Sequence, residues 1–239
     1  LEGMLFPSDN PENSPIVLVV PTYAGRDDFT LEKAKSMNQL GYSGFAVDMY
    51  GDGKIGDSNE ENAAMMQPLL DDREELANRV LAAFDAVSKI ETIDTNKIAI
   101  MGYCFGGLVA IDLARTGADI KAAISFHGFL AGPENSSNEI TAKVLALHGD
   151  SDPMVGQDQI ESFREEMTNK KVEYLKLIKN LSDDIGISEE ETKSLVDIAL
   201  SSTDRRYVNY EELKDEITTF LVINIFSLIC KFLISPLFM

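Results

Sequence analysis

The chain has 239 residues, of which 44% are hydrophobic and 26% charged, and this is enough for one α/β domain with a substantial core. The formal net charge of −19 excludes a protein that binds nucleic acid through its phosphates and favours a soluble protein that holds a small or neutral substrate. The two cysteines, Cys104 and Cys230, lie in unrelated contexts, so we expect no disulfide framework and a reducing, cytoplasmic compartment. The first residue is Leu1 and no secretory signal pattern follows it, so we expect a truncated N-terminus.

Short apolar runs of strand length alternate with amphipathic stretches of helix length along most of the chain. In order, we expect a strand at 16–20, a helix at 29–40, a strand at 44–49, a loop at 51–62, a helix at 69–90, a strand at 98–101, a helix at 106–116, strands at 122–126 and 144–147, and a helix at 157–169. This alternation predicts an α/β fold with a largely parallel sheet that is covered by helices on both faces.

The most informative motif is GYCFG, which begins at Gly102 and joins the strand at 98–101 to the next helix. It is the G-x-nucleophile-x-G pattern with cysteine in the central place. Such a turn puts Cys104 at a helix N-terminus, where the helix dipole favours a thiolate, and the backbone N–H of Phe105 is placed to hold an oxyanion. Gly102 and Gly106 leave room where side chains would collide. We therefore predict that Cys104 is a nucleophile rather than a buried structural cysteine, and that Cys230 is inert.

A second element is the strand at 144–147 and the loop that follows it. In hydrolases with this kind of turn, the acid that orients the catalytic histidine lies in a loop after a strand, downstream of the nucleophile. Asp152 meets that description, and Asp150 competes with it in the same loop. The alternative is an Asp-Pro turn that caps the next helix. We predict that Asp152 is the orienting acid.

Together these segments resemble the dienelactone hydrolase family, a branch of the α/β-hydrolases. The stretches that carry the resemblance are VLVVPTYAGRDDF (17–29), GYSGFAVDMYGDG (41–53), IMGYCFGGL (100–108), ISFHG (124–128) and VLALHGDSDPMV (144–155). The resemblance covers about residues 1–174, and the cysteine in the turn separates this family from the serine esterases and lipases.

The resemblance implies a Cys-Asp-His triad that opens an enol-lactone through an acyl-thioester, with no metal or cofactor. Carried over to this chain, Cys104 is the nucleophile and Asp152 the orienting acid. The loop at Thr22 and Tyr23 would supply the second oxyanion N–H. The implied partner is a small lactone or ester substrate.

The chain departs from the family pattern at the histidine, which should follow Asp152. Its two histidines, His127 and His148, both precede that residue. His127 ends a strand and would line the mouth of the site. We interpret it as a strand-end histidine bonded to backbone rather than as a general base, because a base must lie within hydrogen-bond reach of the thiol and the sequence does not show that distance. His148 is interpreted as structural. With no imidazole for Asp152 to orient, we expect acylation of Cys104 followed by a stall.

Residues 175–219 show helical patterns without a convincing strand, and their last part is similar to the second half of an EF-hand loop that ends at Glu212. The ligand and glycine positions of such a loop carry Ser201, Thr203, Arg205 and Arg206. Calcium needs several oxygen ligands and a tight glycine turn, so we interpret the segment as a degenerate EF-hand and expect no calcium-dependent stabilisation.

Residues 220–239 are almost wholly apolar and long enough to span a bilayer. A C-terminal membrane anchor is one interpretation, although Asn224 and Lys231 near the middle disfavour it. Translation past the true end of the coding exon is a second interpretation, and a buried partner helix is a third.

The sequence as a whole predicts a hydrolase that acts on a small lactone or carboxylic ester through Cys104. A different class of protein is also compatible with it, namely a non-catalytic hydrolase scaffold fused to a calmodulin-like helical interaction module. The feature that separates these two classes is the family histidine after Asp152, which this sequence lacks.

Overall fold

The computed structural model describes residues 1–133, 138–148, 152, 154–170, 172 and 174–177. The EF-hand-like segment from residue 178 onward and the apolar tail at 220–239 lie outside the described residues. Within the described part, the helices are all too short or too polar to cross a bilayer. The described residues belong almost entirely to one compact unit, Leu1–Lys176.

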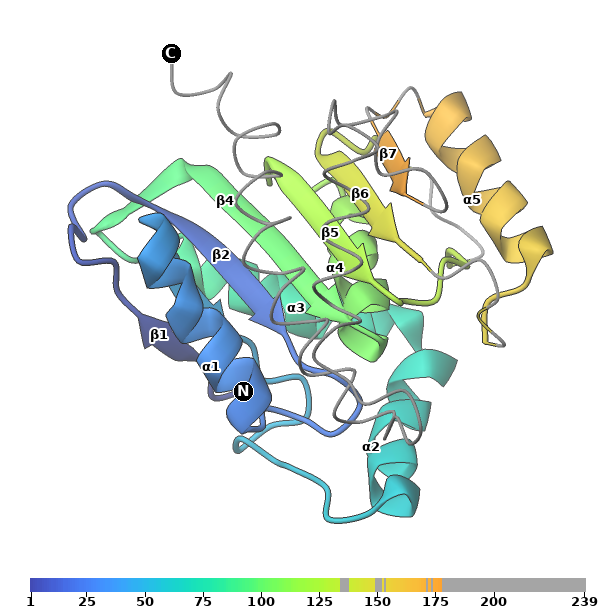
Figure 1. Ribbon diagram of the computed structural model, residues 1–239, viewed down its shortest axis with the longest axis horizontal. Coiled ribbons are helices and arrows are strands. Elements are labelled where there is room, and N and C mark those ends of the chain that lie inside the picture. Colours follow the sequence, from blue (N-terminus) through green and yellow to red (C-terminus); the bar gives the residue numbers. More distant parts are fainter. Residues whose placement is uncertain (134–137, 149–151, 153, 171, 173, 178–239) are drawn as a thin grey trace, which may run out of the picture. The chain divides into compact units, whose positions relative to one another are not determined.

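A seven-stranded sheet in the order β1-β3-β2-β4-β5-β6-β7 forms the centre of this unit (Figure 1). The strands are β1 Met4–Phe6, β2 Ser14–Val20, β3 Ser43–Ala46, β4 Ile93–Tyr103, β5 Ala122–Phe126, β6 Lys143–Leu147 and β7 Tyr174–Leu177. Strands β3, β2, β4, β5 and β6 pair in parallel, and β1 joins β3 in the antiparallel direction at the edge. The carboxyl ends of the central strands therefore meet at one edge of the sheet.

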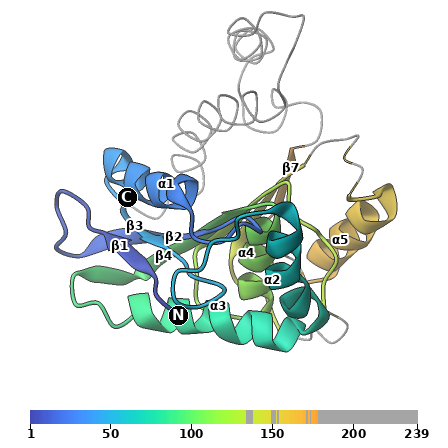
Figure 2. The ribbon, with the colours of Figure 1, turned by 90° about the horizontal axis from the view of Figure 1, so that it is seen from below.

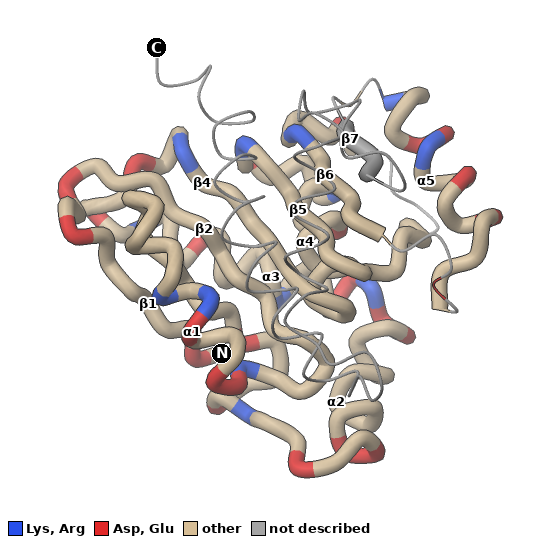
Figure 3. Tube along the Cα trace, in the orientation of Figure 1, with Lys and Arg blue, Asp and Glu red and all other residues tan. Residues whose placement is uncertain are grey.

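Helices cover both faces of the sheet, with α1 on one side and α3 and α4 on the other (Figure 2). The helices are α1 Asp28–Ser36, the short 3-10 helix η1 Met37–Leu40, α2 Asn59–Asp71, α3 Arg73–Val87, α4 Phe105–Arg115 and α5 Gln157–Asn169. Every residue of α4 is buried, including the charged pair Asp112 and Arg115, so its sequence is apolar except at these two positions. Charged residues lie mainly on the helices and loops (Figure 3).

The α/β class and the central strands agree with the sequence-based expectation, but four elements differ from it. The loop expected at 51–62 ends earlier, because α2 begins at Asn59. The single helix expected at 69–90 is two helices, because Ser58 caps α2 and Asp72 caps α3 through its side chain and the N–H of Glu75. The expectation of no strand after residue 175 is wrong, since β7 extends to Leu177. The edge strand β1 also escaped prediction, because a strand of three residues shows no periodicity.

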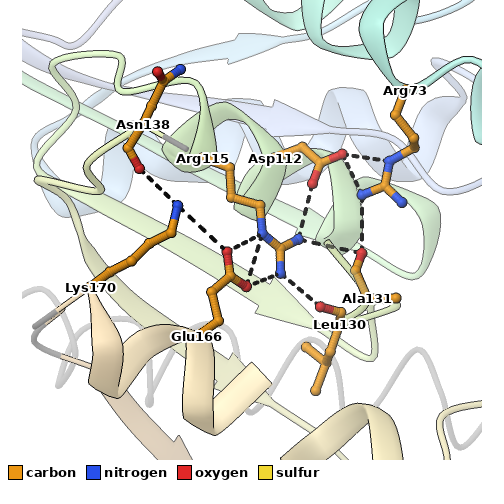
Figure 4. Close-up of polar contacts among 8 residues, drawn as sticks. All are labelled: Arg73, Asp112, Arg115, Leu130, Ala131, Asn138, Glu166 and Lys170. Carbon is orange, nitrogen blue, oxygen red and sulfur yellow. Dashed lines mark hydrogen bonds and ion pairs between the residues drawn. The ribbon is translucent and has the colours of Figure 1, made fainter. Parts of the chain in front are cut away.

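A buried ion-pair network ties α3, α4 and α5 to the loop after β5 (Figure 4). The Arg115 guanidinium, whose side chain is 2% exposed, pairs with Asp112 at 3.0 Å and with Glu166 on α5 at 2.6 Å. It also donates to the Leu130 carbonyl at 2.8 Å. Arg73 on α3 pairs with the same Asp112 at 2.6 Å. The buried guanidinium of Arg115 thus joins α4 to α5 and to the segment that follows β5.

We predict that Arg115→Met lowers the free energy of unfolding by about 3 kcal/mol or more, because removing one partner leaves buried acceptors without their cation. Denaturant unfolding of the two proteins measures the difference. Lys121→Met is the matched control, since Lys121 pairs with the 74%-exposed Asp119 and such surface pairs contribute less than about 1 kcal/mol. Equal losses in the two variants would contradict this account of the network.

Candidate active site

The turn that carries Cys104 joins the end of β4 directly to α4. Cys104 has φ 54° and ψ −115°, so this non-glycine residue lies at positive φ at the N-cap of α4. Its N–H donates to the Phe126 carbonyl at 2.8 Å, and its own carbonyl accepts from the Gly107 N–H at 3.0 Å. Backbone strain of this kind costs on the order of 1–3 kcal/mol and persists only where the surroundings impose it. The result is a partly buried cysteine at the edge of the sheet where the parallel strands end.

Close backbone packing imposes this turn. A Cβ added to Gly106 would lie 2.5 Å from the carbonyl oxygens of both Val20 and Pro21, and one added to Gly102 would lie 2.0 Å from the Gly106 oxygen. The first turn of α4 therefore rests on the end of β2, and the segment with Thr22 and Tyr23 starts beside it. Phe105 is the first residue of α4, so its N–H has no carbonyl one helical turn earlier to donate to.

His127 sits one residue beyond β5 and also has a positive φ, of 58°. Its N–H donates to the Leu147 carbonyl of β6 at 2.9 Å. Gly128, the next residue, packs directly against the backbone of α4. A Cβ added to it would lie 2.6 Å from the backbone of Gly107 and Leu108. The residues that follow β5 therefore pack against the first turn of α4, which also carries Cys104 at its N-cap.

The side chains of Cys104, His127 and Asp152 form a polar chain across the ends of β4, β5 and β6. His127 Nδ1 pairs with Asp152 Oδ2. The Cys104 side chain lies close enough to the same imidazole to act on its charged form. The carboxyl group of Asp152 is 4% exposed and the imidazole of His127 is 43% exposed. The interaction with Cys104 raises the pKa of His127, and the charge of Asp152 raises it further, against the opposing effect of burial.

His148 contacts the same acid from inside the fold. Its Nε2 lies 3.5 Å from Asp152 Oδ2, and its side chain is 2% exposed. The rings of His127 and His148 lie nearly parallel, with centroids 6.2 Å apart. Asp152 is thus held between a buried and a solvent-accessible imidazole.

Tyr50 is a neighbour of the site that the sequence did not single out. Its hydroxyl donates to the Tyr23 carbonyl at 3.0 Å, and its ring stacks on Phe105 with centroids 6.0 Å apart. Burial raises the pKa of Tyr50, and the nearby Cys104 adds to the rise. Tyr50 therefore links the loop after β2 to the first residue of α4.

A buried aspartate organises the loop that carries Tyr50. The Asp48 carboxylate accepts the N–H groups of Tyr50 at 3.0 Å, Gly51 at 2.9 Å and Gly53 at 3.0 Å. Burial acts to raise the pKa of Asp48, but these backbone donors, with that of Glu2, bring it below its ordinary value. No sequence motif indicates this arrangement, because it depends on where β3 ends beside β2.

Two expectations from the sequence are corrected by this geometry. Asp152 does have an imidazole partner, because His127 pairs with it. The His127 side chain therefore binds a carboxylate, and not the backbone group expected from the sequence. The sequence could not show this, because the contact depends on β5 lying between β4 and β6. The competitor Asp150 lies outside the described residues. Among the residues that are described, no cluster of potential ligands could hold a metal ion.

Comparison with known proteins agrees with the fold. The model of the dienelactone hydrolase family matches residues 1–177. The chain belongs to the dienelactone hydrolase family. Among solved structures, the protein titled m3DLH has a TM-score of 0.71 and 28% identity, and the match covers 82% of this chain and 89% of that one. A dienelactone hydrolase-like promiscuous phosphotriesterase from metagenomic libraries matches with a TM-score of 0.69 and 29% identity, at the same coverage.

Curated relatives of this dienelactone hydrolase family member point the same way. A Bradyrhizobium protein named as a probable 2-oxo-3-(5-oxofuran-2-ylidene)propanoate lactonase is 27% identical over 171 residues, which cover 67% of this chain and 68% of the relative. An uncharacterised Caenorhabditis elegans protein is 34% identical over 103 residues, which cover 42% of this chain and 65% of the relative. The chain therefore spans about two thirds of the length of these relatives.

We predict that His127 titrates above the ordinary histidine value of 6.5, because Cys104 and Asp152 both favour its charged form. The stabilisation that follows is fully present below pH 6.5 and is lost as the pH rises through the raised pKa of His127. Since the sequence has two histidines, His127 and His148, an NMR titration of the ring protons reports on each. Cys104→Ala and Asp152→Asn should each lower the pH at the midpoint of the His127 titration. A wild-type midpoint at or below 6.5 would show that these contacts are absent.

Proposed function

We propose that this protein hydrolyses small lactones or carboxylic esters through a thioester on Cys104. The observation that carries the proposal is that the partly buried Cys104 lies on a strained turn at the start of α4, beside an imidazole that is paired to a buried carboxylate. A nucleophile, a histidine and an orienting acid in this order are the parts that acyl transfer needs.

The reaction has two halves. The Cys104 sulfur attacks the substrate carbonyl carbon, a C–S bond forms, the C–O bond to the alcohol breaks, and the thiol proton leaves on the alcohol oxygen. Water then adds to the thioester carbon, the C–S bond breaks, one proton of the water returns to the sulfur, and the acid is released. With a lactone the alcohol remains attached to the same molecule. No cofactor enters either half.

Charge develops on the carbonyl oxygen in both halves, and backbone N–H groups are suited to hold it. The N–H of Phe105 is one donor in this proposal, and the loop at Thr22 and Tyr23 supplies the other. The bond from Tyr50 to the Tyr23 carbonyl fixes that loop beside Phe105. The lactonase name of the Bradyrhizobium relative supports a lactone as the substrate class.

Two further expectations belong to the proposal. A free nucleophilic thiol works best in a reducing compartment, which supports a cytoplasmic location. The stall after acylation that the sequence predicted rested on Asp152 having no imidazole, and the pairing of Asp152 with His127 removes the reason for it.

The proposal predicts that an activated aryl ester leaves one acyl group on Cys104, seen as a mass increase in the intact chain and located by peptide mapping. Cys104→Ala should fold with an unchanged melting temperature and lose at least about 10³-fold of the hydrolase activity. Cys230→Ser is the matched control and should keep both the acylation and the rate. If Cys230→Ser abolished acylation, or if Cys104→Ala kept its hydrolase activity, Cys104 would be ruled out as the nucleophile.

A further inference from the structure

We propose that His127, at the end of β5, is the general base for Cys104 and takes the place of the histidine that the family carries after the orienting acid. The inference rests on the proposed function and names the group that moves the protons in it. The sequence places both of its histidines before Asp152, so the base would come from the strand next to the nucleophile rather than from a later segment.

The first support is the direction of the two contacts that the imidazole makes. Nδ1 of His127 is committed to the Asp152 carboxylate, and the side chain of Cys104 also acts on the same imidazole. An imidazole has two ring nitrogens, so Nε2 is the one left to face the thiol. This is the division of roles that a nucleophile, base and acid require.

The second support is backbone geometry. Cys104 and His127 have φ values of 54° and 58°, both positive, although neither is glycine. The two strained residues end neighbouring parallel strands, where Tyr103 pairs with Phe126. Close packing of Gly128 on α4 supports the strain at these two adjacent strand ends, where Cys104 and His127 follow neighbouring strands directly.

Exposure decides between the two histidines that touch Asp152. The base must reach both the thiol and an incoming water molecule. The His127 side chain is 43% exposed, whereas that of His148 is 2% exposed. His148 lies 3.5 Å from the same carboxylate oxygen and is placed to position the acid, not to meet water.

In the reaction, His127 Nε2 accepts the proton of the Cys104 thiol as sulfur attacks, and gives it to the departing alcohol oxygen. In the second half, Nε2 accepts a proton from water as the hydroxide adds to the thioester carbon, and returns it to the sulfur as the C–S bond breaks. Asp152 stays ionised throughout and stabilises the imidazolium. At the end of both halves, His127 is neutral again and Cys104 carries its thiol proton.

The test compares wild type with His127→Asn and His127→Gly, two variants that suit a positive φ and should therefore fold, as a melting curve checks. An activated aryl acetate is the probe, with product release followed after rapid mixing and acyl-Cys104 followed by intact mass. We expect steady turnover by wild type. We expect His127→Asn to release about one product per chain and then stall, with deacylation slowed ~10²–10⁴-fold. Added imidazole should restore deacylation in His127→Gly.

Three results would overturn the proposal. A wild-type chain that also stalls after one product, or a His127→Asn chain that deacylates at the wild-type rate, leaves Cys104 as nucleophile and removes His127 as base. A stall that appears in His148→Gln but not in His127→Asn assigns the base to His148. The proposed function itself fails in a different way, through the absence of any acyl group on Cys104 in all of these proteins.

Discussion

The contact on which the site depends is the backbone packing of the first turn of α4 against the ends of β2 and β5. Gly106 meets the carbonyls of Val20 and Pro21, and Gly107 meets Gly128. Because these glycines carry no side chain of their own, the loop after β2, the thiol of Cys104 and the residue after β5 converge within one helical turn. That approach brings together the N–H of Phe105, the thiol of Cys104 and the imidazole of His127.

The rest of the unit holds this strained edge in place. Strand β4 and helix α4 are buried along most of their length, so the positive φ of Cys104 is supported by a core that cannot relax around it. On the far side of α4, Arg115 fixes the carbonyl of Leu130, three residues beyond His127. A buried ion pair that stabilises the fold thereby also limits how far the segment after β5 can move.

The sequence predicted what depends on local pattern. The central strands, the turn at Cys104 and the loop position of Asp152 follow from apolar runs, glycine spacing and strand length. It failed where the outcome depends on which strands are neighbours. His127 belongs to a short strand whose partners are set by chain crossovers, so its contact with Asp152 has no signal in spacing. Tyr50 is similar, because its bond to Tyr23 joins two loops that β3 and β2 bring together. The one available hint was a histidine directly after a strand that should neighbour the strand before Cys104.

The central claim is that Cys104, His127 and Asp152 act as one unit at the carboxyl edge of the sheet. A crystal structure of the chain trapped as a thioester on Cys104, with a slowly hydrolysed acyl group, tests it most directly. The account predicts that His127 Nδ1 stays on Asp152 while Nε2 lies ~2.6–3.2 Å from a water molecule that faces the thioester carbon. A structure in which the His127 ring has turned into solvent, with Asp152 bound to His148 alone, would contradict it.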